Sequence, residues 1–217
     1  TDIDCPDSTC PIDPDRPADI VLGQPNFNTS ACNGDSAFQS YPNAPLPTAT
    51  TLCGVLWNQV SISEGGSAVT MVTDPSGNLY VPDFFNNRIL RYDDPFNTDT
   101  VADYVWGQPG FDHKECNEGG TPNNSNLCLA PPPGLGMLKS GVEIDLNGNL
   151  WVADTQNNRV LRFPWEPILG RPGPTADLVW GQPDLSSKTS GAGLNQLNKP
   201  TSVRIDDGGT VYVADGG

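Results

Sequence analysis

The chain has little of what most enzymes and nucleic-acid-binding proteins depend on. Its 217 residues include one histidine, two methionines and 11 Lys or Arg against 26 Asp or Glu, which gives a formal net charge of −15. A surface of this sign repels phosphate backbones and anionic lipid headgroups, which argues against nucleic-acid binding. No apolar run approaches the roughly 18–20 residues that span a bilayer, so membrane insertion is not expected.

A secretory leader and an initiator methionine are also missing, and we interpret Thr1 as a processed or excised start. The chain has 23 glycines and 22 prolines, and this many prolines exclude an all-α bundle because proline breaks helices. Glycine and proline together still stay below the roughly 25–30% at which disorder becomes the default. With 36% hydrophobic residues, the composition indicates a turn-rich, folded chain.

What the sequence does contain is internal repetition. An Ala-Asp-x-Val-x-Gly-Gln-Pro block begins at Ala18, Ala102 and Ala176. A second block, which ends in Val-x-Asp, follows each time at 77–83, 148–154 and 209–215, and a third block is present at 86–92 and 157–163. Self-similarity of this kind is typical of repeat architectures. We therefore predict an N-terminal extension (1–17) and three units at approximately 18–101, 102–175 and 176–217, the last of which stops inside the repeat.

Each unit predicts four short antiparallel strands. One strand ends at Gly-Gln-Pro, and a second alternates apolar and polar residues, as at 142–144. Tight glycine-bearing turns at 74–78, 145–149 and 206–209 lead into the third strand. Four antiparallel strands repeated radially form the blade of a β-propeller, so the expected fold is an all-β propeller with about three blades present.

The stretches Asp74–Tyr92 (DPSGNLYVPDFFNNRILRY) and Asp145–Phe163 (DLNGNLWVADTQNNRVLRF) resemble the NHL-repeat family. The Gly-Gln-Pro block is similar to the variant found in large bacterial extracellular repeat proteins. The resemblance implies a propeller of four-stranded blades. It implies little about activity, because propellers host unrelated functions.

Long inserts separate the Gly-Gln-Pro from the next strand, and four of the six cysteines lie in the first two inserts. Cys32 and Cys116 each lie nine residues after the glycine of the block, and Cys53 and Cys128 each follow a leucine. This symmetry predicts the disulfides Cys32–Cys53 and Cys116–Cys128, and it leaves Cys5–Cys10 as a small local loop. Paired cysteines indicate an oxidising compartment, so we expect an extracellular or cell-surface protein. With no C-x-x-C and only His113, a zinc site has few candidate ligands.

Several charged residues recur once per unit. Asp83, Asp154 and Asp215 occupy one position, and Arg88 and Arg159 follow the first two after five residues. Carboxylate–guanidinium bracing of a hairpin explains this pattern better than catalysis does.

The turn residues Asp145, Asn147 and Asn149, with Asp74 and Asn78, offer oxygens at alternating positions, as calcium prefers. An EF-hand also needs a glutamate at its twelfth position, where this chain has Gln156 or Phe85. A β-turn is therefore the simpler interpretation. Calcium stays possible but unassigned, and no cofactor is expected.

Two segments fit the sequon for N-linked glycans, at Asn28 and Asn123, and both lie in the inserts. The stretch Pro45–Thr51 (PLPTATT) has a composition that suits O-linked sugar. Chance alone yields about this many sequons in a chain so rich in asparagine. Glycans are therefore possible partners.

Taken together, these features favour a non-enzymatic extracellular scaffold. We expect it to belong to a larger or self-assembling structure such as a fibre or surface layer, because three blades cannot close a ring that needs typically 4–8. The expected partners are copies of the chain or further blades of a longer one. The alternative is a metal-dependent propeller lyase or hydrolase, of which NHL relatives include examples. Its site would be completed by further blades. Three or more His, Asp or Glu converging near the axis would favour that alternative.

Overall fold

The computed structural model describes residues 18–29, 31–34, 44–53, 70–130 and 140–217, and these form antiparallel sheets joined by turns and loops. The predicted N-terminal extension (1–17), with Cys5 and Cys10, lies outside the described residues. Two sheets have four strands and two have two strands. The only helical segments among the described residues are four short 3-10 turns: η1 (Cys32–Gly34), η2 (Phe84–Asn86), η3 (Cys116–Gly119) and η4 (Thr155–Asn157). No helix in this part of the chain is long and apolar enough to cross a membrane.

The two four-stranded sheets have the same plan. The first runs in the order β1 (Val72–Thr73), β2 (Leu79–Asp83), β3 (Arg88–Tyr92) and β4 (Tyr104–Trp106). The second runs in the order β5 (Val142–Ile144), β6 (Leu150–Asp154), β7 (Arg159–Phe163) and β10 (Leu178–Trp180). In both sheets the repeated aspartate lies opposite the repeated arginine across the central pair of strands.

A third, two-stranded sheet follows, made of β11 (Pro200–Ile205) and β12 (Val211–Asp215). A separate hairpin of β8 (Trp165–Glu166) and β9 (Arg171–Pro172) interrupts the second sheet between β7 and β10. The sequence did not indicate this hairpin.

Turn chemistry explains the first hairpin of each sheet. Gly77, Gly148 and Gly209 take φ angles of 85°, 80° and 81°, a left-handed conformation that glycine adopts without steric cost. The aspartate that opens each turn accepts backbone N–H groups through its carboxylate, as Asp145 does from Asn147 (2.9 Å) and Asn149 (3.0 Å). The turn therefore fixes the register of both strands locally.

The boundaries of the sheets do not coincide with the boundaries of the sequence units. The strand that ends at Gly-Gln-Pro does not begin a new sheet: β4 pairs with β3, and β10 pairs with β7, so each completes the sheet of the preceding unit. The corresponding residues 20–22 form no strand. The expectation that each unit builds its own four strands is therefore corrected, because this strand depends on a partner from its neighbour.

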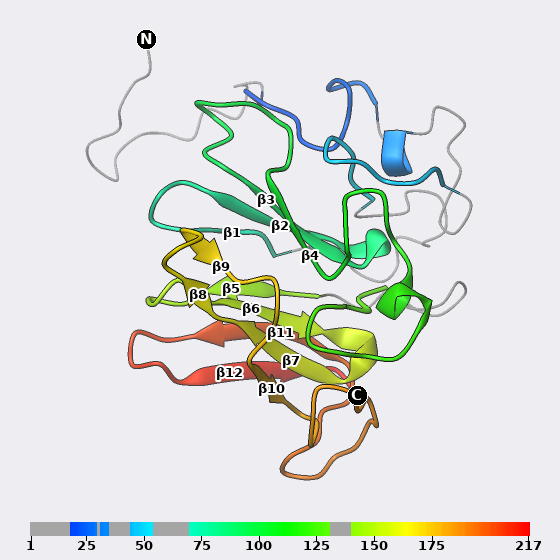
Figure 1. Ribbon diagram of the computed structural model, residues 1–217, viewed down its shortest axis with the longest axis vertical. Coiled ribbons are helices and arrows are strands. Elements are labelled where there is room, and N and C mark those ends of the chain that lie inside the picture. The colour runs from blue at the N-terminus through cyan, green and yellow to red at the C-terminus, as the bar shows by residue number, and fades with distance from the viewer. Residues whose placement is uncertain (1–17, 30, 35–43, 54–69, 131–139) are drawn as a thin grey trace.

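The three sheets stack side by side, and their first strands lie next to one another (Figure 1). Thr70 and Gly141, at the starts of two such strands, form a parallel bridge, and a Cβ on Gly141 would lie 3.0 Å from the Cα of Ser202 in the third sheet. The hairpin turns lie at one end of the stack, and the 3-10 turns and inserts lie at the other (Figure 1). The described strands form an open stack and do not close a ring.

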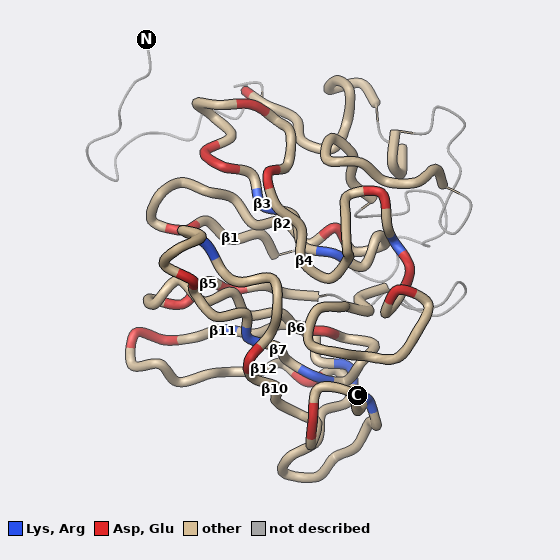
Figure 2. Tube along the Cα trace, in the orientation of Figure 1, with Lys and Arg blue, Asp and Glu red and all other residues tan. Residues whose placement is uncertain are grey.

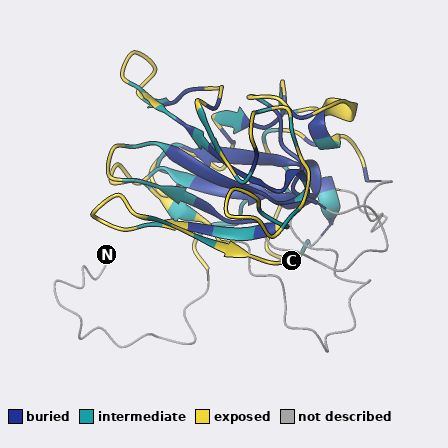
Figure 3. Cartoon of the chain, turned by 90° about the horizontal axis from the view of Figure 1, so that it is seen from below, coloured by how far each residue is buried: buried dark blue, intermediate teal, exposed yellow. Residues whose placement is uncertain are grey.

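Burial falls off towards the third sheet. All five residues of β6 are buried, whereas β12 alternates between intermediate and exposed residues (Figure 3). The main apolar cluster lies between the first and second sheets and includes Trp106, Val152 and Leu161.

Candidate functional site

A buried polar cluster recurs at the insert end of both four-stranded sheets. In the first, Asp83 accepts three hydrogen bonds: from the backbone N–H of Cys53 (2.6 Å), from Asn86 Nδ2 (2.8 Å) and from Arg88 Nε (2.7 Å). In the second, Asp154 accepts the matching bonds from Cys128, Asn157 and Arg159 at 2.7, 2.8 and 2.7 Å. Asp83, Arg88, Asp154 and Arg159 all have zero exposure, so both ion pairs are fully buried.

The arginines use the rest of their donors on the inserts. Arg159 donates to the backbone carbonyls of Leu185, Asn123 and Asn126, the last two at 3.0 Å. Arg88 makes the equivalent bonds to Phe111, Thr48 and Thr51. Each guanidinium thus ties a β-hairpin to the insert before it and to the insert after it.

Asparagines connect the clusters to the disulfide loops. Asn33 and Asn86 exchange side-chain hydrogen bonds at 3.0 and 2.7 Å, and Asn117 and Asn157 do the same at 2.9 and 2.8 Å. Asn33 and Asn117 each follow a cysteine and take positive φ angles of 54° and 50°. The turn beside each bridge therefore aims an amide into the cluster.

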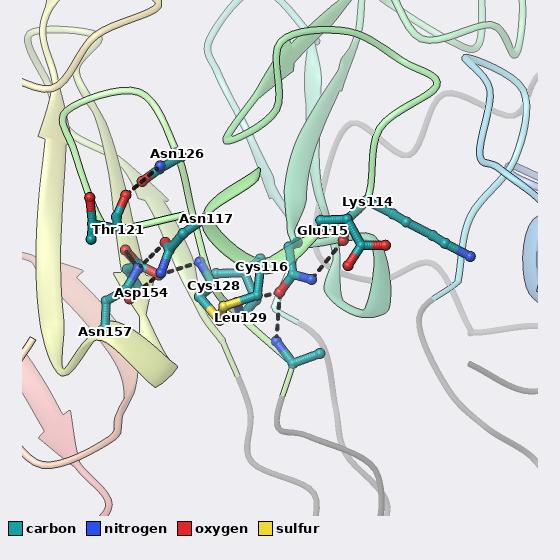
Figure 4. The surroundings of a disulfide bond; sticks show 12 residues. Lys114, Glu115, Cys116, Asn117, Thr121, Asn126, Cys128, Leu129, Asp154 and Asn157 are labelled. Carbon is teal, nitrogen blue, oxygen red and sulfur yellow. Dashed lines mark hydrogen bonds between the residues drawn. A yellow bond between two sulfur atoms is a disulfide. The ribbon is translucent and has the colours of Figure 1, made fainter. Parts of the chain in front are cut away.

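Both disulfides expected from the spacing are present in the described residues, Cys32–Cys53 and Cys116–Cys128. Figure 4 shows the second, with Asp154, Asn157 and Asn117 on one side and Leu129 on the other. The predicted Cys5–Cys10 bridge falls on residues that are not described.

The chemistry open to these clusters is limited by their burial. Burial raises the pKa of the Asp154 carboxyl group, and the Arg159 guanidinium and the bonds from Asn157 and Cys128 offset this only in part. Both carboxylate oxygens already accept protein donors, and the side chain has no exposed surface. The arrangement positions the inserts and leaves no room for a substrate atom.

The Gly-Gln-Pro glutamine is a residue whose role the sequence analysis missed. Gln24, Gln108 and Gln182 each donate from Nε2 to the carbonyl seven residues later, at 2.8, 3.0 and 3.0 Å. Gln108 and Gln182 also donate to the carbonyls of Asn87 and Asn158 in the preceding hairpin. The repetition of the block was a signal for this role, but we had assigned the block only to the end of a strand.

The hairpin-turn aspartates lie at the opposite end of the stack, where acidic positions recur (Figure 2). Asp145 Oδ2 accepts hydrogen bonds from Trp151 Nε1 (2.9 Å) and Asn149 Nδ2 (2.8 Å), and Asp74 accepts the equivalent bond from Asn78. Burial raises the pKa of Asp145, but the bonds from Trp151, Asn149 and Asn147 outweigh it, so the net shift is downward. N–H groups therefore occupy the oxygens that the calcium hypothesis would use.

The remaining candidates lie apart from one another. His113 is half-exposed, with Nε2 3.5 Å from Asp112 Oδ1. Over the ranges that the structure describes, no group of three or more His, Cys, Asp or Glu could hold a metal ion. The sequon residues Asn28 and Asn123 are both exposed, and the Asn123 side-chain oxygen accepts three bonds from Ser125 and Asn126.

A cavity of about 510 Å³ opens between the second and third sheets. Trp180, Gln182, Leu194, Gln196 and Val213 are among the residues that line it. Trp180 is 39% exposed, whereas Trp106, its equivalent in the first sheet, is 1% exposed. No sequence feature pointed to this cavity.

Comparison with known proteins finds relatives that are named as lyases. The chain is 30% identical over 125 residues to peptidyl-alpha-hydroxyglycine alpha-amidating lyase 1 of Drosophila melanogaster, covering 52% of the chain and 21% of that protein. It is 25% identical over 193 residues to the amidating lyase 2 of the same organism, covering 82% of the chain and 41% of that protein. The chain thus spans less than half the length of the curated relatives it matches.

Other comparisons add little. A structure of streptogramin B lyase superposes on 67% of the chain and 33% of its own, with a TM-score of 0.36 and 10% identity. No family model matches the chain.

The amidating lyases correct the expected function. The interpretation as a non-enzymatic scaffold, fibre or surface-layer element is contradicted, because the curated relatives are lyases. The scaffold interpretation treated the features of this chain as those of a whole protein, although its relatives are more than twice as long. The chain is similar, over most of its length, to part of a peptidyl-alpha-hydroxyglycine amidating lyase.

Proposed function

We propose that this chain is part of an extracellular lyase with an NHL-like β-propeller fold that cleaves peptides ending in α-hydroxyglycine. The observation that carries the proposal is the similarity to amidating lyase 2, which extends over 193 residues and 82% of the chain. A match of this length cannot come from one repeated motif, because it must include at least one insert as well as the strands.

The proposed reaction is balanced without an oxidant. The bond between the amide nitrogen and the hydroxyl-bearing carbon breaks, and the nitrogen gains a proton. The hydroxyl loses its proton, and its carbon becomes the aldehyde of glyoxylate. A site for this reaction needs a base near the hydroxyl and an acid near the nitrogen.

The described residues supply the frame for such a site. The buried clusters around Arg88 and Arg159 and the two disulfides hold the inserts at one end of the sheets. Loops held on a rigid scaffold are where propellers and other repeat folds place their binding surfaces. Groups that bind substrate are therefore expected at the insert end, beside the clusters and not within them.

The extracellular location in this proposal rests on the paired cysteines. All cysteines among the described residues are in disulfides, which persist in oxidising compartments. A substrate that is a secreted peptide would meet the enzyme in the same compartment.

An activity assay on the natural protein that contains this chain tests the proposal. Antibodies raised against the 217-residue chain would isolate that protein, and a short peptide ending in α-hydroxyglycine would be supplied. We expect glyoxylate and peptide amide in equal amounts, at a rate well above that of the peptide alone. The same peptide ending in plain glycine is the control and should give neither product. Glyoxylate release no faster than the spontaneous rate, from protein with intact disulfides, would overturn the proposal.

A further inference from the structure

The third sheet carries one half of the polar cluster that is complete in the other two. Asp215 Oδ1 accepts the backbone N–H of Asn198 at 2.8 Å. The equivalent bonds run from Cys53 to Asp83 at 2.6 Å and from Cys128 to Asp154 at 2.7 Å. Asn198 therefore takes the place of the insert cysteine, and the loop before it is already docked onto β12.

The other half of this cluster has no donor in the part of the chain that the structure describes. In the complete clusters, Oδ2 of the aspartate accepts an asparagine amide and an arginine Nε, as Asp154 does from Asn157 and Arg159. Asp215 is exposed, and its Oδ2 accepts no hydrogen bond from a described residue.

The third insert also has the backbone carbonyls that would accept hydrogen bonds from such an arginine. Arg159 donates to the carbonyls five and two residues before Cys128, and Arg88 to those five and two residues before Cys53. The same offsets from Asn198 give Gly193 and Gln196. Gly193 O accepts the Gln196 N–H at 2.9 Å, as Thr48 O accepts the Thr51 N–H in the first unit. The loop therefore has the turn that presents these carbonyls elsewhere.

Next to the incomplete polar cluster at Asp215, the third sheet has an apolar position that is also only partly covered. Val152 in β6 has zero exposure and lies opposite Leu161 of β7, whereas Val213 in β12 is only partly buried. Trp106 belongs to the same buried cluster as Val152 and Leu161, but its equivalent Trp180 remains 39% exposed. The cavity of about 510 Å³ lies between Trp180 and Val213, where a leucine equivalent to Leu161 would fit.

We propose that this edge of the third sheet binds a β-strand of the form Asn-Asn-Arg-x-Leu-Arg, supplied by a further repeat of the same kind. The strand would pair antiparallel with β12, with its first arginine opposite Asp215 and its leucine opposite Val213, in the register that joins β6 and β7. The arginine would donate to Asp215 Oδ2 and to the carbonyls of Gly193 and Gln196. This inference does not depend on the proposed lyase activity.

A second copy of the chain is a poor source for this strand. Its two Asn-Asn-Arg strands, β3 and β7, are the buried interiors of their own sheets, with Arg88, Leu90, Arg159 and Leu161 at zero exposure. Offering either strand to another molecule would dismantle a sheet. The relatives are more than twice as long as this chain, so a protein of their size has length for another repeat.

A synthetic peptide tests the proposal on the 217-residue chain. A fluorescently labelled peptide that copies residues 157–163 (NNRVLRF) should bind saturably, and the intrinsic tryptophan fluorescence should shift to the blue as Trp180 is covered. Replacing the peptide's first arginine (R159A) should weaken binding at least tenfold. Replacing its second arginine (R162A) is the matched control and should change affinity little, because Arg162 is 30% exposed in its own sheet.

The protein side of the contact is tested separately. Asp215→Asn should also weaken peptide binding at least tenfold, whereas Asp207→Asn, at an exposed turn residue of the same hairpin, should not. Equal binding of the wild-type and R159A peptides, or no binding at millimolar peptide, would overturn the proposal. Sedimentation of the chain as a dimer that Asp215→Asn abolishes would overturn it too, since a second copy would then occupy the edge. The peptide variants leave the protein unchanged, so misfolding cannot imitate these results.

Discussion

Arg159 links three segments that are far apart in the sequence. Its guanidinium bonds to Asp154 in the hairpin, to Asn123 and Asn126 in the insert before it, and to Leu185 in the insert after it. The Arg159 side chain is fully buried, so its removal would leave the buried Asp154 carboxylate and the buried Asn126 carbonyl without this donor.

We therefore expect Arg159→Ala to lower the free energy of unfolding by about 3–5 kcal/mol, the cost of leaving one member of a buried ion pair unpaired. Arg162→Ala is the control: its pair with Asp177 is 30% and 42% exposed, so its loss should cost about 1 kcal/mol or less. Urea unfolding of both variants gives the comparison. Equal losses would contradict the bracing role of Arg159.

Asp184, in the third insert, accepts several local hydrogen bonds. Its Oδ1 accepts bonds from the Ser186 hydroxyl (2.7 Å), the Ser186 N–H (2.8 Å) and the Ser187 N–H (2.8 Å), and these lower its pKa to about 2. A lowered pKa in the folded state means that the stability contribution is present above the unfolded value of roughly 3.9. It is lost as the pH falls through about 2.

A carboxyl carbon NMR titration should therefore find Asp184 ionised down to about pH 2. Ser186→Ala should raise the Asp184 pKa, because the hydroxyl bond is the largest cause of the shift. Ser190→Ala, in the same insert but outside this contact, should leave the titration unchanged. A pKa for Asp184 that does not respond to Ser186→Ala would show that the hydroxyl bond is not formed in solution.

At the scale of single residues, the sequence predicts the charged pair of each cluster but not the backbone groups that the arginine contacts. Asp154 and Arg159 recur at a fixed spacing and attract each other, so their pairing could be predicted. The carbonyls of Asn123 and Asn126 could not, because any residue type carries a backbone carbonyl and only the path of the insert brings these two to the guanidinium. The glutamine of Gly-Gln-Pro was visible as a repeat, but its acceptor is also a backbone carbonyl.

Among the elements, the first two inserts are each closed by a disulfide. The Cys116–Cys128 bridge closes a short loop, with a sequence separation of 12, that contains η3 and leads to the backbone N–H bonded by Asp154. A native bridge of this kind typically contributes about 2–4 kcal/mol.

Replacing both cysteines (Cys116→Ser with Cys128→Ser) should lower the free energy of unfolding by about 2–4 kcal/mol. The loss should appear first as faster amide exchange in residues 116–128, while β6 and β7 keep their protection, because the loop lies outside the sheet. Cys32→Ser with Cys53→Ser is the matched comparison and should speed exchange in the first insert instead. Simultaneous loss of protection in β6 and β7 would mean that the bridge supports the sheet itself.

The hairpins could be predicted because their determinants are local: an aspartate, a positive-φ glycine and alternating strand residues lie within one short stretch. Two elements could not. The strand that ends at Gly-Gln-Pro forms at 104–106 and 178–180 but not at 20–22, because it needs a neighbouring edge to pair with. The β8–β9 hairpin occurs only once, so the repeats in the sequence gave no support for it. Its contact with Trp106, which donates from Nε1 to Gly173 O at 2.8 Å, comes from another sheet.

For the whole molecule, the three sheets come close together at the starts of their first strands. Gly141 lies between Thr70 and Ser202, and a Cβ there would come within 3.0 Å of Thr70 Oγ1 and of the Ser202 backbone. Backbone at that distance cannot rotate away as a side chain can, so an added methyl group requires the neighbouring strand to shift by a few tenths of an ångström.

Gly141→Ala should therefore destabilise the protein by about 1–3 kcal/mol through overpacking. Gly120→Ala is a suitable control, because its φ is −117° and the nearest atom to an added Cβ is 3.5 Å away. Thermal unfolding followed by circular dichroism compares the two. A Gly141→Ala protein as stable as the wild type would show that the neighbouring strand can shift without cost.

The function predicted from the sequence was wrong. The repeated residues Arg88 and Arg159 form buried contacts between hairpins and inserts, but the non-enzymatic interpretation is contradicted by the relatives. Residues that stabilise the fold occur in every unit, so they can be recognised in the sequence as repeated positions. Catalysis needs a few groups at one place, and a chain that spans 41% or less of its relatives need not hold them.

The short separations of the two bridges, 21 and 12 residues, bear on how the protein is made. Loop-closure entropy grows with the length of the loop, so each cysteine meets its native partner more often than any cysteine of the other insert. Each pair can therefore oxidise within its own segment, before the following unit has been synthesised. Loop length thus disfavours cross-links between the two inserts, and the Cys116–Cys128 bridge can form without any residue outside its own insert.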